Sequence, residues 1–193
     1  ESFFLSCFSK AFIHMFFYDK KKWTQPRIRS FLKAVPDNKL ILLDYYCDHT
    51  EIWRNTEKYY GNPYIWCYLG NFGGNTMIAG NLNDIDFKIK RLFKEGGDNV
   101  YGLGATLEGF DVNPLMYEFV FDQAWDYPVT TDQWITNWSM CRGGNQDANI
   151  IKAWRALHQK IYTEHATCGQ SVLMNARPRL TGTKSWNTNP GIH

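Results

Sequence analysis

Three short apolar runs, separated by a helical pattern and turn residues, constrain the fold of this 193-residue chain most strongly. They cover residues 40–46, 64–69 and 100–107, and runs of this length without alternation are typical of strands covered on both faces. Between the second and third runs, apolar residues from Ile78 to Leu92 recur at helical spacing. This alternation predicts parallel strands in an α/β fold, and the residues alone leave an open sheet and a barrel as alternatives.

The last third of the chain has a different pattern, because two helical patterns follow each other without a strand pattern between them. Thr130 and Gln133 form a capping box before the first helix, and Asp147 opens the second. We therefore predict a partial α/β domain over residues 1–128 and the start of an all-α domain over residues 129–193.

Composition excludes several classes of function. The formal net charge is +2 and there is no basic stripe, which argues against nucleic acid as a partner. No apolar run is long enough to span a membrane. The five cysteines are widely spaced and form no CxxC pair, so we expect no metal site. Aromatic residues make up 17% of the chain, which suits a carbohydrate site or aromatic core packing.

Polar side chains follow each predicted strand at its carboxyl end, where parallel α/β folds collect their functional groups. They are Asp44, then Asn71 and Asn75, and then Glu108, which follows a glycine-rich strand and precedes Gly109. Glu108 suits a catalytic carboxylate, and the alternative is a structural carboxylate paired with an arginine or capping a helix. Glycoside cleavage needs two carboxylates, and Asp44 is a candidate for the second by position, or else a supporting hydrogen-bonding group.

Several segments resemble one enzyme family. Residues 64–75 (YIWCYLGNFGGN) and 102–117 (GLGATLEGFDVNPLMY) resemble signature segments of the α-N-acetylglucosaminidases, glycoside hydrolase family 89. The stretch 23–46, which contains VPDNKLILLDYY, and the tripeptide 176–178 (ARP) are also similar to that family. The resemblance extends over residues 16–190, with the segments in the family's order.

The resemblance implies a retaining enzyme that removes terminal α-linked N-acetylglucosamine from glycans without a cofactor or metal. It implies the C-terminal part of a (β/α)8 TIM barrel followed by the start of an all-α domain. Glu108 matches the nucleophile and Tyr45 matches a position that lines the sugar pocket. Trp66, Asn71 and Asn75 belong to the signature, and we include them with Asp44 and Tyr45 as candidate substrate-binding residues. The family also implies a periplasmic or secreted location.

Three departures from the family pattern are present. The family's general acid is a Glu in an Asn-Glu step on an earlier strand, and this sequence contains no such step, so we expect the acid before Glu1. His14 stands where the family has a pocket tryptophan, and Arg142 is followed by two glycines where the family has a second arginine and an aromatic residue. A non-catalytic sugar-binding remnant and an unrelated open-sheet α/β enzyme therefore stay as alternatives. Glycosaminoglycan ends and mucin glycans are both candidate substrates.

Overall fold

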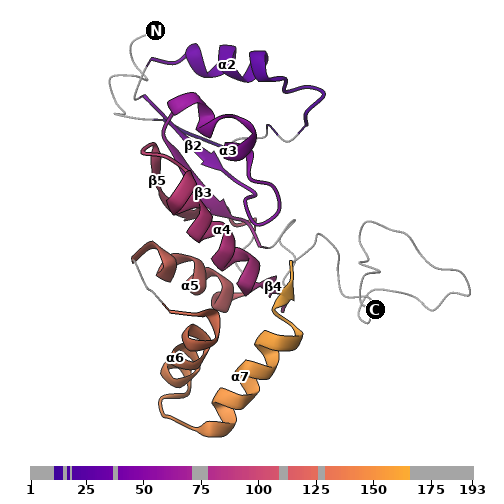
Figure 1. Cartoon of the computed structure of the whole chain (residues 1–193), viewed down its shortest axis with the longest axis vertical. Helices are drawn as coiled ribbons and strands as arrows, with labels where there is room; N and C mark the ends of the chain where they lie inside the picture. The colour runs from indigo at the N-terminus through magenta and orange to yellow at the C-terminus, as the bar shows by residue number, and fades with distance from the viewer. Residues whose placement is uncertain are drawn as a thin grey trace, which may run out of the picture. The chain divides into compact units, whose positions relative to one another are not determined.

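The computed structural model describes residues 11–14, 17, 19–36, 39–70, 78–108, 113–125 and 129–165, with only the backbone for the first four. Their contacts divide the chain into two units, drawn together in Figure 1. The first unit contains the described residues up to Leu69 and from Phe87 to Thr106. The second contains those from Gly70 to Asp86 and from Leu107 onward. Each unit is described by itself.

The first unit contains a sheet of four parallel strands. These are β1 (Ala11–His14), β2 (Leu40–Asp44), β3 (Tyr64–Tyr68) and β5 (Val100–Ala105), in the order β1-β2-β3-β5. The three apolar runs of the sequence therefore form parallel strands, as predicted. The strand β1 was not predicted from the sequence.

Helices connect the strands. Helix α2 (Gln25–Lys33) lies between β1 and β2 and begins directly after Thr24, with Pro26 in its first turn. The short helix α3 (Ile52–Asn55) and the 3-10 turn η1 (Lys58–Gly61) lie between β2 and β3. Helix α4 (Leu82–Glu95) precedes β5, and its residues from Phe87 onward belong to the first unit.

One face of β2 and β3 carries the fully buried side chains. Leu42 pairs with Tyr64 and Asp44 pairs with Trp66 in the parallel ladder, and all four are 0% exposed. Because successive side chains of a strand point to opposite faces, these four lie on one face of the sheet. The Tyr64 hydroxyl donates to the carbonyl of Gly96, directly after α4. This face of the sheet is therefore directed toward the helices.

The opposite face is covered in part among the described residues, since Ile41 and Cys67 are 5% and 1% exposed whereas Leu43 and Ile65 are half-buried. The sequence had predicted strands covered on both faces. An apolar run indicates that a strand needs burial but does not say which segment provides it. On this face Gly104 lies opposite Cys67, and a Cβ at Gly104 would come within 3.1 Å of the Cys67 sulfur and 2.9 Å of Ile65. The close strand approach therefore requires a glycine there.

The second unit is mainly helical in its described residues. Helix α5 (Pro114–Asp122) continues into the 3-10 turn η3 (Gln123–Trp125), and α6 (Thr131–Gly143) and α7 (Ala148–Lys160) follow. The Thr130 hydroxyl accepts a hydrogen bond from the Gln133 backbone, as the predicted capping box requires.

Two small strands and a set of aromatic contacts complete the second unit. Strands β4 (Gly80–Asn81) and β6 (Thr163–Glu164) form a two-residue antiparallel ladder that the sequence did not predict. Edge-to-face ring contacts join Phe119 to Trp134 (4.9 Å) and Trp138 to Trp154 (4.6 Å). Across the described parts of both units, no helix has the length and hydropathy to span a membrane.

Candidate functional site

Asp44, the last residue of β2, is fully buried and accepts hydrogen bonds from the beginning of α3. Its Oδ2 accepts from the Trp53 backbone N–H at 3.0 Å and its Oδ1 from that of Ile52 at 3.4 Å. Burial raises the pKa of Asp44 to about 7, and the two backbone donors oppose this shift. The carboxylate therefore caps α3 from the end of a strand.

Glu51, in the loop between β2 and α3, is a second buried carboxylate and holds three donors. Its Oε1 accepts from the indole N–H groups of Trp53 and Trp66, both at 3.1 Å. Its Oε2 accepts from Arg91 on α4, with which it forms an ion pair. The only polar side-chain atom of Trp66 is therefore used inside the protein.

The sequence reasoning missed Glu51 and Arg91. The two residues are 40 positions apart, and Glu51 lies in a loop with no motif around it. A charged residue in a loop is normally solvated, so nothing in the local pattern indicated that Glu51 would be buried.

The turn after β2 is hydrogen-bonded to the ends of β3 and β5. The Cys47 N–H donates to the Cys67 carbonyl at 3.1 Å, and the Leu69 N–H donates to Asp48 Oδ1 at 3.1 Å. The Thr106 hydroxyl, just beyond β5, donates to the Tyr45 carbonyl at 2.6 Å. Together these bonds fix the loop that carries the predicted sugar-contacting Tyr45.

Glu108 is the second residue after Thr106, and it is the second residue of the later segment of the second unit, which begins at Leu107. It is exposed, and the preceding Leu107 is 49% exposed. Its carboxylate is therefore not in a buried structural position of the kind that Asp44 and Glu51 occupy. Gly109, Asn71 and Asn75 lie outside the described residues.

The predicted site residues thus have different surroundings. Asp44 and Trp66 are neighbours in the ladder and face the helices, and Tyr45 is buried in the adjoining turn. The contacts of Asp44 and Trp66 favour a supporting role, and direct sugar contact by either stays a prediction. The same holds for sugar contact by Tyr45 and for Glu108 as the nucleophile.

The cysteines in the described part of the chain are free thiols that differ in burial. Cys47 and Cys67 are buried free thiols, and Cys141 is an exposed one. Burial raises the pKa of Cys67 to about 12, so this thiol stays protonated near neutral pH. In the described ranges, no group of three or more His, Cys, Asp or Glu side chains could hold a metal ion.

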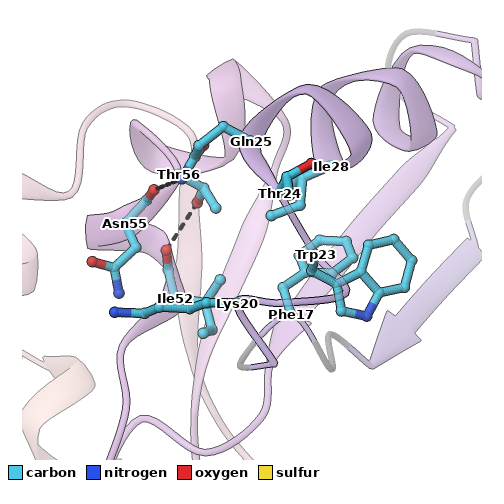
Figure 2. A pocket seen from close by; sticks show the side chains of 9 residues that line it. All are labelled: Phe17, Lys20, Trp23, Thr24, Gln25, Ile28, Ile52, Asn55 and Thr56. Carbon is cyan, nitrogen blue, oxygen red and sulfur yellow. Dashed lines mark hydrogen bonds between the residues drawn. The ribbon is translucent and has the colours of Figure 1, made fainter.

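A pocket of about 270 Å³ lies in the first unit, between the start of α2 and α3. Figure 2 shows Phe17, Trp23 and Ile28 on one side of it, with Lys20 and Asn55 on the other. None of the residues that line it is a predicted site residue. Its lining is a mixture of aromatic, aliphatic and polar side chains, and the side chains of Gln25 and Thr56 are used in hydrogen bonds within the protein.

Comparison with known families gives two matches in chain order. Residues 12–127 match the alpha-N-acetylglucosaminidase (NAGLU) tim-barrel domain. Residues 134–192 match the alpha-N-acetylglucosaminidase (NAGLU) C-terminal domain. The two matches together confirm the resemblance found in the sequence motifs.

Comparison with individual proteins agrees with these matches. The chain is 30% identical to human alpha-N-acetylglucosaminidase over 152 residues, which cover 77% of this chain and 20% of the human protein. A family 89 glycoside hydrolase from Clostridium perfringens in complex with PUGNAc aligns with a TM-score of 0.72 and 24% identity, over 90% of this chain and 19% of that one. A variant of the same organism's enzyme, in complex with its substrate GlcNAc-alpha-1,4-galactose, aligns with a TM-score of 0.73 and 23% identity. This alignment covers 92% of this chain and 20% of that one. The chain therefore spans about a fifth of the length of these relatives, and the two alignments show a shared fold.

Proposed function

Since this chain belongs to the alpha-N-acetylglucosaminidase family, we propose that it contributes the nucleophile Glu108 to a retaining exo-α-N-acetylglucosaminidase. The observation that carries the proposal is the position of Glu108. It stands at the carboxyl end of a parallel strand, inside the segment that matches the family's barrel domain, and its side chain is exposed. In barrel enzymes that end of the strands carries the catalytic groups.

The proposed reaction is a double displacement. The Glu108 carboxylate attacks the anomeric carbon of a terminal α-linked N-acetylglucosamine, while an acid protonates the leaving oxygen. This forms a β-linked glycosyl-enzyme ester, which water hydrolyses with net retention of configuration. Glu108 must be ionised for this attack, so the exposed position of its side chain is compatible with the role.

The general acid is not among the residues that match the family motif, because the 193 residues contain no Asn-Glu step. A nucleophile without an acid can still cleave substrates whose leaving group needs no proton. We propose a glycan with a terminal α-linked N-acetylglucosamine as the natural substrate, with glycosaminoglycan ends and mucin glycans as the two candidates. The proposed location is periplasmic or secreted.

The test compares two α-N-acetylglucosaminides, one with a 2,4-dinitrophenyl leaving group and one with methyl. The chain should cleave the dinitrophenyl glycoside and not the methyl glycoside, because only the first can leave unprotonated. Glu108→Gln should abolish the cleavage, since an amide is a poor nucleophile. Glu95→Gln is the matched control, because Glu95 is also an exposed carboxylate that lies just before β5. Cleavage that survives Glu108→Gln would contradict the proposal.

A second candidate function is sugar binding without hydrolysis by these 193 residues, which contain no Asn-Glu step. In that case the chain would bind N-acetylglucosamine in a calorimetric titration, while neither glycoside would be cleaved. Glu108→Gln would then alter only the affinity.

A further inference from the structure

Thr106 connects three strand ends through two hydrogen bonds. It follows the last residue of β5 and is 6% exposed. Its backbone N–H donates to the carbonyl of Tyr68, the last residue of β3, at 3.0 Å. Its hydroxyl donates to the carbonyl of Tyr45, the first residue after β2, at 2.6 Å. Because β3 lies between β2 and β5, no backbone hydrogen bond of the sheet joins β5 to β2. The Thr106 side chain makes this connection by bonding to the turn after β2.

Tyr45 is the residue whose backbone Thr106 holds. Tyr45 is 5% exposed, and its ring centroid lies 6.0 Å from that of Tyr46. Because the ring is buried, its neighbours limit its rotation, and fixing the backbone fixes the point from which the ring projects. A buried carbonyl that loses its donor also has a free-energy cost, which favours rearrangement of the turn.

We propose that Thr106 is a positioning residue, which holds Tyr45 in the orientation needed to contact the sugar. The sugar part of this inference rests on the proposed function, whereas the hydrogen-bond part does not. The hydroxyl is the group of Thr106 that holds Tyr45. The Thr106 backbone N–H donates to Tyr68 instead, and any replacement other than proline would keep that bond.

The test uses two replacements at Thr106 and one control. Thr106→Val keeps the shape and removes the hydroxyl, whereas Thr106→Ser keeps the hydroxyl. Thr56→Val is the matched control, because Thr56 is a threonine of the same unit, 1% exposed, whose hydroxyl donates to the Ile52 carbonyl at 2.9 Å. A general loss of stability would affect both valine variants alike.

Hydrogen exchange detected by mass spectrometry gives the first measurement. Thr106→Val should speed amide exchange in residues 45–50 by about tenfold, the size expected for one lost buried hydrogen bond. Thr106→Ser and Thr56→Val should leave exchange in that segment close to that of the unchanged chain. Equal exchange in Thr106→Val and the unchanged chain would overturn the inference.

Calorimetric titration with 2-acetamido-1,2-dideoxynojirimycin gives the second measurement. Thr106→Val should weaken binding by about tenfold, with Thr106→Ser restoring most of the affinity, because small misplacements in a site have large effects. Faster exchange with unchanged affinity would overturn the positioning role and leave a purely structural hydrogen bond. Absence of binding by the unchanged chain would overturn the proposed function and, with it, the sugar part of the inference. The exchange result would still decide whether Thr106 holds the turn.

Discussion

The loop after β2 in the first unit and the α6–α7 pair in the second are held by different interactions. The loop depends on buried carboxylates, since Asp48 and Glu51 within it, and Asp44 directly before it, are all at most 7% exposed. The helix pair has its charge pairs on the surface, such as that between Arg155 and Asp132, whose side chains are 45% and 52% exposed.

Aromatic rings replace buried charges in the helix pair. Trp134 contacts Phe119, and Trp138 contacts both Trp134 and Trp154. Ring pairs are favourable over centroid distances of about 4.5–7 Å, whereas a carboxylate that accepts several donors fixes positions more closely. The buried carboxylates therefore lie in and beside the loop that contains Tyr45, where sugar contact is predicted. The ring packing lies in the α6–α7 pair, where no sugar contact is predicted.

The largest effect in this comparison is expected from Glu51→Ala. The change leaves Arg91 and the indole N–H groups of Trp53 and Trp66 without their acceptor, and breaking a buried ion pair costs about 3–5 kcal/mol. Urea denaturation should show this loss in the free energy of unfolding of the first unit.

The control for this variant is Glu57→Ala. Glu57 pairs with Arg29 on the surface, where its side chain is 75% exposed, so the loss should be under about 1 kcal/mol. Equal losses in the two variants would show that the buried network contributes no more than a surface pair.

A smaller effect is expected from Trp134→Phe in the helix pair. The change keeps an aromatic ring beside Phe119 but removes the indole N–H that donates to Asp122 Oδ2 at 2.8 Å, together with part of the buried ring. The expected loss is about 2 kcal/mol. Trp125→Phe is the control, since Trp125 is 81% exposed, and it should leave the free energy of unfolding unchanged. A loss from Trp134→Phe as small as that of the control would contradict the role of ring packing.

The two units should respond to pH in opposite directions. Burial raises the pKa of Asp44 to about 7, so the folded first unit binds more protons than the unfolded chain between about pH 4 and 7. The stability of the first unit should therefore fall as pH rises through this range.

Burial lowers the pKa of His158 on α7, with Asp132 opposing the shift, and both ring nitrogens lack a hydrogen-bond partner among the described residues. The unfolded chain therefore binds more protons below about pH 6.5, and the second unit should lose stability as pH falls.

Protection factors from hydrogen exchange at about pH 5.5 and 7.5 measure both responses. Protection of residues 40–44 should be higher at the lower pH, and protection of residues 148–160 should be lower. His158→Phe should remove the acid response of the second unit only. Protection that changes in the same direction in both segments would contradict the assignment of the two pH responses to Asp44 and His158.

The smallest effect is expected from Arg155→Ala. The pair with Asp132 is half-exposed and screened by solvent, so the free energy of unfolding should change by less than about 1 kcal/mol. Added salt should reduce even that difference. A loss as large as that of Trp134→Phe would show that surface charges contribute as much to the helix pair as its rings.

Most of the secondary structure could be predicted from the sequence, because it follows from periodicity and turn residues. The three apolar runs are strands, and Thr130 caps α6 as its spacing required. Asn113 stands at the N-cap position of α5, but its side chain accepts no hydrogen bond from the helix, and its amide donates to the Ala79 carbonyl at 3.2 Å. No local sequence pattern indicates that a side chain will bond to a carbonyl 34 residues away.

The surroundings of the site residues could not be predicted. A continuous apolar run gives no alternation, so the sequence did not indicate that Asp44 and Trp66 face the helices. The family resemblance supplied the family assignment, which the domain matches confirm. It also supplied the role of Glu108 as nucleophile, which stays a prediction. The domain boundary near residue 128 stays a prediction.

The central claim is that Glu108 is a glycosidase nucleophile, and covalent trapping tests it most directly. A 5-fluoro glycosyl fluoride of N-acetylglucosamine configuration needs no acid, since fluoride leaves unprotonated, and its glycosyl-enzyme ester is hydrolysed slowly. Peptide mass spectrometry should find one added sugar, attached to Glu108, and none in Glu108→Gln. An unlabelled chain, or a label on another carboxylate, would contradict the claim.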